Sequence, residues 1–152
     1  MTWYEFLKTV HILAVAIWVG GGIQILIHGL RAMAANDTAR LAGVVSAGAW
    51  TGPRVFTPAS LLLVITGFLM IADADWDYKL WVILGLIGWF ATFITGSMFL
   101  GPTAKKVDQM LPEKGHAAPE VTALNRRLLN VVRVDAVVLV LVLADMVIKP
   151  GL

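Results

Sequence analysis

The sequence predicts an all-α fold, a transmembrane four-helix bundle with both termini on the outer side, and three observations support it. The 152 residues are 59% hydrophobic and only 14% charged, whereas soluble domains are about 45–50% apolar and about 25% charged. The apolar residues gather into stretches of roughly 20, the length that crosses a bilayer. Lys and Arg concentrate in two of the connections between these stretches. The expected partner is the lipid bilayer, and a net charge of +2 is too small to indicate nucleic acid.

The predicted spans fill most of the chain, which we expect to be one domain over residues 1–152. Helices are the expected form because backbone groups in lipid must find hydrogen-bond partners within their own segment. Trp3 and Tyr4 open the first span as an interfacial aromatic anchor. The four spans are predicted at about residues 3–28, 55–72, 80–100 and 128–148. Their predicted stops are Arg31, Asp73 with Asp75, Gly101-Pro102 and Pro150-Gly151.

Two longer connections join these spans. Residues 38–50 are mildly amphipathic, and Asp37 offers an N-cap for a helix there. The turn-forming sequence Thr51-Gly52-Pro53 is predicted to end that helix. Residues 105–127 form the longest polar stretch and are predicted to be a surface loop, helical at most at its ends.

Positive charge predicts the orientation, because Lys and Arg are enriched in cytoplasmic connections. The side that carries the termini has only Lys8, Lys79 and Lys149. The other side has eight basic residues: Arg31, Arg40, Arg54, Lys105, Lys106, Lys114, Arg126 and Arg127. We therefore expect both termini outside and the two long connections in the cytoplasm.

The chain contains no cysteine. Disulfides, thiolate metal sites, iron–sulfur clusters and cysteine nucleophiles are therefore excluded. Glu5 and Lys8 interrupt the N-terminal segment, which lacks the pattern of a cleavable signal. We expect the first hydrophobic stretch to be a retained helix.

Ionisable side chains at membrane depth are candidates for function, because burying a charge in lipid is costly. They fall into two predicted layers. The outer layer holds Lys8, His11, Lys79 and Asp145, with Met70 and Met146 nearby. The inner layer holds His28, Arg54, Arg133 and Asp135.

His11 is the first candidate. Trp18 lies about two helical turns further on and shares its face, and Gly20-Gly21-Gly22 removes side-chain bulk that would keep a helix or a flat cofactor away. A functional His11 would be a metal ligand, a haem ligand or a proton-handling group. A structural His11 would hydrogen-bond to a neighbour such as Asp145, and spacing alone favours this structural role.

His28 lies 17 residues beyond His11, which is roughly 25 Å along one helix. The two histidines therefore cannot ligate one iron within a single chain. If haem is present, its second ligand must be a residue such as Met70 or Lys79, a water molecule, or a residue of another chain. For His28 itself an interfacial position near Arg31 is favoured.

The remaining charged residues are predicted to hold the helices of the bundle together. Arg133 and Asp135 face different sides of their helix, so each needs another partner, such as Arg54 for Asp135. Asp145 and Lys149 are spaced to pair with each other. Close helix packing is predicted at the glycines of the third span: Gly85, Gly88 and Gly96.

Three segments carry a resemblance. Residues 8–21 contain Lys8, His11, Trp18 and a glycine pair, and they resemble the first helix of a group of bacterial membrane proteins. The group includes the CopD copper-resistance proteins and the HemJ-type protoporphyrinogen oxidases. Lys79-Leu80 is similar to the start of the third helix of the HemJ type. Residues 145–151 look like the end of a related family of small four-helix proteins of unassigned function, which matches the length best.

The resemblance implies a bacterial inner membrane location and a role for several residues. HemJ-type proteins bind b-type haem, which makes His11 and Lys79 the implied catalytic pair and His11 the implied metal ligand. The implied cofactor contacts are His11, Trp18, Gly21, Met70 and Lys79. The later histidines of the HemJ type have no counterpart in this chain.

Three hypotheses follow. The first is a redox protein associated with haem b, in which Lys79 contacts a propionate. The second is a non-catalytic subunit or scaffold of a homo-oligomer or larger membrane complex. The third is a CopD-like copper-handling protein with His11, Met70 and Met146 as soft ligands. Whether the protein is an enzyme stays open.

Overall fold

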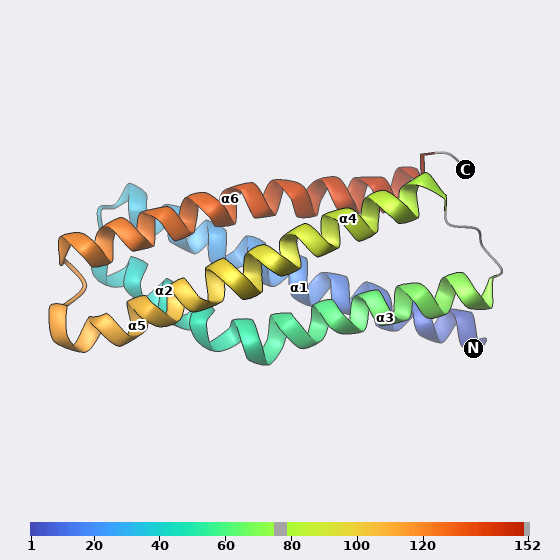
Figure 1. Ribbon diagram of the computed structural model, residues 1–152, viewed down its shortest axis with the longest axis horizontal. Coiled ribbons are helices and arrows are strands. Elements are labelled where there is room, and N and C mark those ends of the chain that lie inside the picture. The colour runs from blue at the N-terminus through green and yellow to red at the C-terminus, as the bar shows by residue number, and fades with distance from the viewer. Residues whose placement is uncertain (75–78, 151–152) are drawn as a thin grey trace.

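Four long helical rods run along the molecule (Figure 1). The computed structural model describes residues 1–74 and 79–150, and every regular element in these ranges is helical. The first rod is α1 (Trp3–Ala34) and the fourth is α6 (Pro119–Ile148). The second joins α2 (Thr38–Thr51), η1 (Gly52–Phe56) and α3 (Thr57–Asp73). The third joins α4 (Leu80–Ile94), η2 (Thr95–Leu100) and α5 (Gly101–Lys114).

The rods pack as antiparallel pairs. α1 lies against α3, α4 lies against α6, and contacts between α1 and α6 join the pairs. At the other end of the bundle α2 packs against α5. The first turn of α1, the end of α3, the start of α4 and the end of α6 therefore share one end of the molecule (Figure 1). The predicted all-α fold with four long helices is therefore confirmed.

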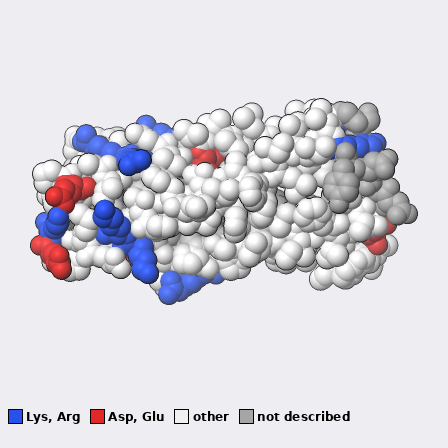
Figure 2. All heavy atoms as spheres, viewed as in Figure 1, with Lys and Arg blue, Asp and Glu red and all other residues white. Residues whose placement is uncertain are grey.

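The bundle is longer than a membrane is thick. Its rods contain between 30 and 36 residues, which corresponds to about 45–54 Å of helix against about 30 Å of hydrocarbon. The excess lies at the end away from the termini, where most Lys and Arg side chains gather (Figure 2). The charged end therefore forms a helical extension of the apolar part.

Large apolar side chains are exposed on the rest of the bundle. They come from every rod: Ile12, Leu13, Ile17, Ile65, Phe68, Ile87, Phe90, Val137 and Leu141 are examples. Exposed apolar surface on this scale is expected only where lipid replaces water. Among the described residues, three rods are long and apolar enough to cross a membrane: Trp3–Ala34, Thr38–Asp73 and Leu80–Lys114. The apolar part of α6 lies beside them but carries Arg133, Asp135 and Asp145.

Two predicted chain breaks are wrong. The second rod continues through Thr51-Gly52-Pro53 and the third through Gly101-Pro102, each by way of a widened π-helical turn. In these turns the N–H of Thr57 bonds to the carbonyl of Gly52, and that of Gly101 to the carbonyl of Gly96. A wider turn gives room to proline, which has no N–H to donate and would clash with a regular turn.

The predicted loop over residues 105–127 is also wrong. α5 runs to Lys114 and α6 begins at Pro119, so only a short connection separates them. Ala104, Val107, Val121 and Leu128 are buried together and form a core for this extension. The Lys114–Glu120 ion pair joins the two helices and lowers the pKa of the Glu120 carboxyl.

Other predicted helix boundaries lie closer to the observed ones. The amphipathic segment after residue 37 is helical, with the Asp37 side chain accepting a bond from the N–H of Arg40. Arg31 does not stop the first helix, which continues to Ala34. The predicted stops at Asp75 and Gly151 lie outside the described residues.

Candidate functional site

His11 lies where α1 faces α3, half-buried among the helices. Its ring nitrogen Nδ1 is 3.0 Å from Oγ1 of Thr66, which is only 4% exposed. The ring also packs beside Gly67, where an added Cβ would lie 3.5 Å from Cε1 of His11, an ordinary van der Waals distance. His11 therefore bonds across the helix pair to Thr66, and not to the predicted neighbour Asp145.

Hydrogen bonding at Thr66 determines which nitrogen of His11 carries a proton. The Thr66 hydroxyl is 2.7 Å from the carbonyl of Leu62 and 3.0 Å from that of Leu63. A hydroxyl has one proton, and these carbonyls accept it. The Thr66 oxygen then accepts from Nδ1–H of His11, and the lone pair of Nε2 remains available.

The glycine segment of α1 has a packing role at one of its three positions. A Cβ at Gly21 would lie 2.5 Å from the ring of Phe56 in η1. The space at Gly21 is thus filled by an aromatic side chain of the neighbouring rod. Gly20 and Gly22 have no such neighbour within 4 Å, and Trp18 is half-buried on the same helix face as His11.

The other predicted site residues are spread over the outer half of the bundle. Met70 follows Thr66 by one turn of α3, so the two residues lie on the same side of that helix. Lys79 is the N-cap residue of α4, a helix that packs mainly on α6 and only lightly on α3. The Met146 side chain packs its methyl group on Gly85 of α4. The three copper-ligand candidates are therefore divided between two helix pairs.

Asp145 lies at the contact between α4 and α6. Both of its carboxylate oxygens are buried, and neither has a hydrogen-bond partner among the described residues. The backbone N–H of Lys149 bonds to the Asp145 carbonyl, while the Lys149 ammonium group lies 5.0 Å from the ring centre of Trp81. The predicted side-chain ion pair between Asp145 and Lys149 is therefore not formed.

The inner-layer pairing of Asp135 with Arg54 is likewise absent. Arg54 lies over the ring of Trp50 at 5.0 Å and donates to the Trp50 carbonyl. Arg133 is exposed and its guanidinium is 3.4 Å from the side-chain oxygen of Asn130. Asp135 instead points into a groove between two rods.

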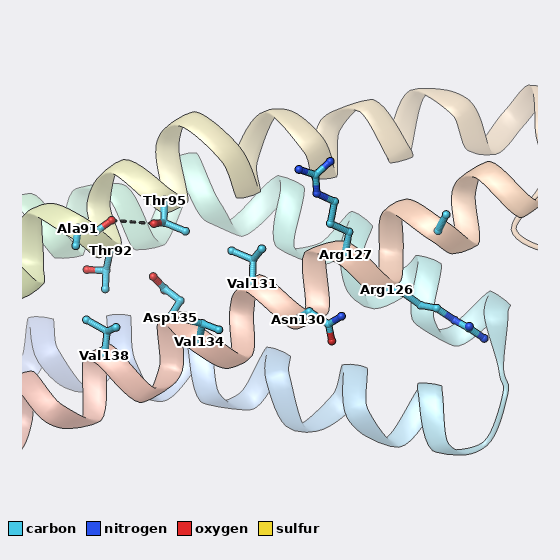
Figure 3. Close-up of a pocket in the computed structure, with 11 residues that line it drawn as sticks. Ala91, Thr92, Thr95, Arg126, Arg127, Asn130, Val131, Val134, Asp135 and Val138 are labelled. Atoms are coloured by element: carbon cyan, nitrogen blue, oxygen red, sulfur yellow. Dashed lines mark hydrogen bonds between the residues drawn. The ribbon is translucent and has the colours of Figure 1, made fainter.

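This groove, of about 630 Å³, runs between α4–η2 and α6 (Figure 3). Thr92, Thr95 and Ala91 line one side, and the α6 side chains line the other. Figure 3 shows Asp135 directed toward Thr95 and Thr92, with Arg127 reaching toward the opposite rod. The full α6 lining is Ala123, Arg126, Arg127, Asn130, Val131, Val134, Asp135 and Val138. The sequence marked Asp135 as polar at membrane depth but gave no sign of the groove.

Residues 1–74 and 79–150 contain no cluster of carboxylate or imidazole side chains that could bind a metal ion. No three side chains of the His, Cys, Asp or Glu type come close enough there to hold an ion together. Any ligand role of His11 therefore needs further ligands of another kind or from another molecule.

Comparison with known proteins gives one match. The family described as "Predicted integral membrane protein (DUF2269)" matches residues 5–150. No curated protein matches the chain, and no solved structure does. The match agrees with the expectation of a small membrane-protein family without an assigned function, and it does not extend to the CopD or HemJ type.

Proposed function

The chain belongs to the DUF2269 family of integral membrane proteins, and on that premise we propose that it is a haem-associated membrane protein. In this proposal His11 would be a residue that holds the iron of haem b. The observation that carries the proposal is the hydrogen bond to Thr66, which fixes the ring and leaves the Nε2 lone pair available. A metal-ligating histidine usually donates its other ring N–H to a hydrogen-bond acceptor, and this bond orients the ring.

The residues around His11 fit haem in part. One ligand is at hand, and Lys8, one turn nearer the helix start, places a cation where it is able to meet a propionate. Lys79 is a second such cation at the same end of the bundle. Met70 lies one turn beyond Thr66 on α3. A further ligand would be Met70, water or a residue of another chain.

Haem bound in this way would supply one-electron redox chemistry. The role of the protein's own residues is to hold and orient the His11 ring. Thr66 sets the tautomer of His11, and the apolar side chains of α1 and α3 exclude water from the ring. We include no oxidation of protoporphyrinogen in the proposal.

The proposal also gives the protein an orientation in the bacterial inner membrane. The basic extension formed by α2, α5 and the start of α6 lies in the cytoplasm, following the positive-inside rule. Both termini and the His11 end of the bundle then face outward. α6 is the fourth span in this arrangement: Asp135 lies in a groove and Asp145 is buried, whereas Arg133 is exposed.

A second candidate, a non-catalytic subunit of a membrane complex, is favoured by one observation. Ala16 and Gly20 lie one turn apart on α1 and both are exposed, and a Cβ at Gly20 would meet nothing within 4 Å. Small residues at this spacing allow another helix to approach closely in a membrane. This face of α1 is therefore open to a partner helix.

Paired substitutions test the haem proposal. The chain, expressed with an adequate haem supply, is purified as wild type, His11→Ala and His28→Ala, and the haem-to-chain ratio is measured. His28→Ala is the matched control, because it removes a histidine of the same helix about 25 Å away. We expect haem in the wild type and the control and its loss in His11→Ala. Equal haem loss in both variants would contradict the assignment to His11, and a haem-free wild type that co-purifies with stoichiometric partners would favour the subunit.

A further inference from the structure

We propose that the groove between α4–η2 and α6 binds one anionic phospholipid, with its phosphate at Arg126 and Arg127 and an acyl chain along the valines below. The groove lies on a different helix pair from His11, so this inference is independent of the haem proposal. Its exposed surface is mostly apolar, although Thr92, Thr95, Asn130 and Asp135 also line it, and its two arginines lie at one end (Figure 3).

The level of the two arginines matches that of lipid headgroups. The apolar part of α6 extends from residue 128 to Ile148, the last residue of the helix. These 21 residues span about 31 Å, close to the thickness of the hydrocarbon core. Arg126 and Arg127 therefore lie at the boundary where phosphates are found, and the groove extends from them toward the middle of the membrane.

Both arginines are available for a phosphate. They are exposed, and no carboxylate in the described part of the chain forms an ion pair with either of them. The Arg127 guanidinium lies 5.1 Å above the ring of Phe99, which holds it at the groove wall. Figure 3 shows the two side chains extending in different directions, so Arg126 would turn toward Arg127 to share one phosphate. Guanidinium groups bind phosphate oxygens through paired donors.

The groove below the arginines suits an acyl chain. Val131, Val134 and Val138 follow each other along α6 on the groove side and continue the apolar wall. From Arg126 to Val138 the groove follows about 18 Å of helix, and its volume of about 630 Å³ is within the usual range for small-molecule pockets.

Asp135 does not compete for the phosphate. It lies eight residues beyond Arg127, which is about 12 Å deeper along the helix. On the facing wall, the hydroxyls of Thr92 and Thr95 donate to backbone carbonyls of their own helix. The Asp135 carboxyl group therefore borders the acyl chain without reaching the headgroup.

Lipid retention by the purified full-length chain tests the proposal. The protein in mild detergent is mixed with equal amounts of phosphatidylglycerol and phosphatidylcholine, and bound lipid is counted by native mass spectrometry. We expect one phosphatidylglycerol per chain, and a preference over phosphatidylcholine that falls about thirtyfold in the Arg126→Gln/Arg127→Gln variant. Arg133→Gln removes an exposed arginine of the same helix that does not line the groove, so it should keep the preference.

A second variant separates the groove from the charge. Ala91→Trp fills the groove and leaves both arginines in place, so it should also lose bound phosphatidylglycerol while retaining wild-type helix content. Equal retention of the two lipids by the wild type would overturn the proposal, as would unchanged retention in either the double-arginine or the Ala91 variant. Displacement of the lipid by inorganic phosphate would assign the site to a free anion and would also overturn it.

Discussion

At the residue scale, the environment of His11 depends on a threonine of another helix. The Thr66 hydroxyl gives its proton to the backbone of α3 and receives that of His11. His11 could be singled out from sequence, because a histidine in an apolar span near Trp18 is unusual. Thr66 could not, because a threonine in a helix ordinarily bonds to its own backbone and gives no sign of a partner across the bundle.

Replacing the threonine hydroxyl tests this contact. Thr66→Val keeps the shape of the side chain and removes both bonds, leaving Nδ1 of His11 without a partner. We expect the free energy of unfolding in detergent to fall by about 1 kcal/mol, and haem occupancy to fall with it. Thr66→Ser keeps the hydroxyl and is the matched control. Equal stability of the two variants would show that the hydroxyl does not support His11.

At the element scale, two segments with proline and glycine do not end their helices, although such segments usually do. Thr51-Gly52-Pro53 and Gly101-Pro102 are typical of chain breaks, yet π-helical turns carry both rods past them. Packing in a long bundle favours continuous rods, and that packing cannot be seen in a short window of sequence. The polar stretch after residue 104 predicts a loop because its apolar face is narrow, whereas the structure forms a helix there with Val107 fully buried.

Close packing between α4 and α6 depends on Gly88. A Cβ there would collide with a methyl group of Val142, which is branched and has little freedom to move. We expect Gly88→Ala to lower the free energy of unfolding by about 1–3 kcal/mol. Adding Val142→Ala should recover part of the loss, because the two changes share one contact.

The control for that substitution is Gly20→Ala. No atom lies within 4 Å of the added Cβ at this position, and alanine is the better helix former. Its stability in detergent should match or slightly exceed that of the wild type. A loss as large as that of Gly88→Ala would mean that the effect comes from helix geometry and not from packing against α6.

At the scale of the whole molecule, composition was enough to predict a membrane bundle, and the charge pattern predicted its two unlike ends. Figure 2 shows the basic end away from the termini. The groove along α6 was beyond prediction, because it depends on how two rods diverge in space. The span assignment of α6 rests on its place beside α4 and α1, since its charged residues weaken the sequence signal.

Single cysteines test the orientation, because the chain contains none of its own. A cysteine at Thr2 should react with a membrane-impermeant maleimide in intact cells, and so should one at Pro150 if α6 crosses the membrane. A cysteine at Gly115, between α5 and α6, should react only after the membrane is opened. Labelling of Gly115→Cys in intact cells would reverse the orientation, and labelling of only one terminal position would show that the number of spans is odd.

The most direct test of the account is the dithionite-reduced minus oxidised absorption spectrum of the purified wild-type chain, expressed with adequate haem and compared with His11→Ala. The account predicts a Soret band and a reduced b-type haem band in the wild type, both lost in His11→Ala. A wild-type spectrum without a Soret band, or an unchanged spectrum in His11→Ala, would contradict it.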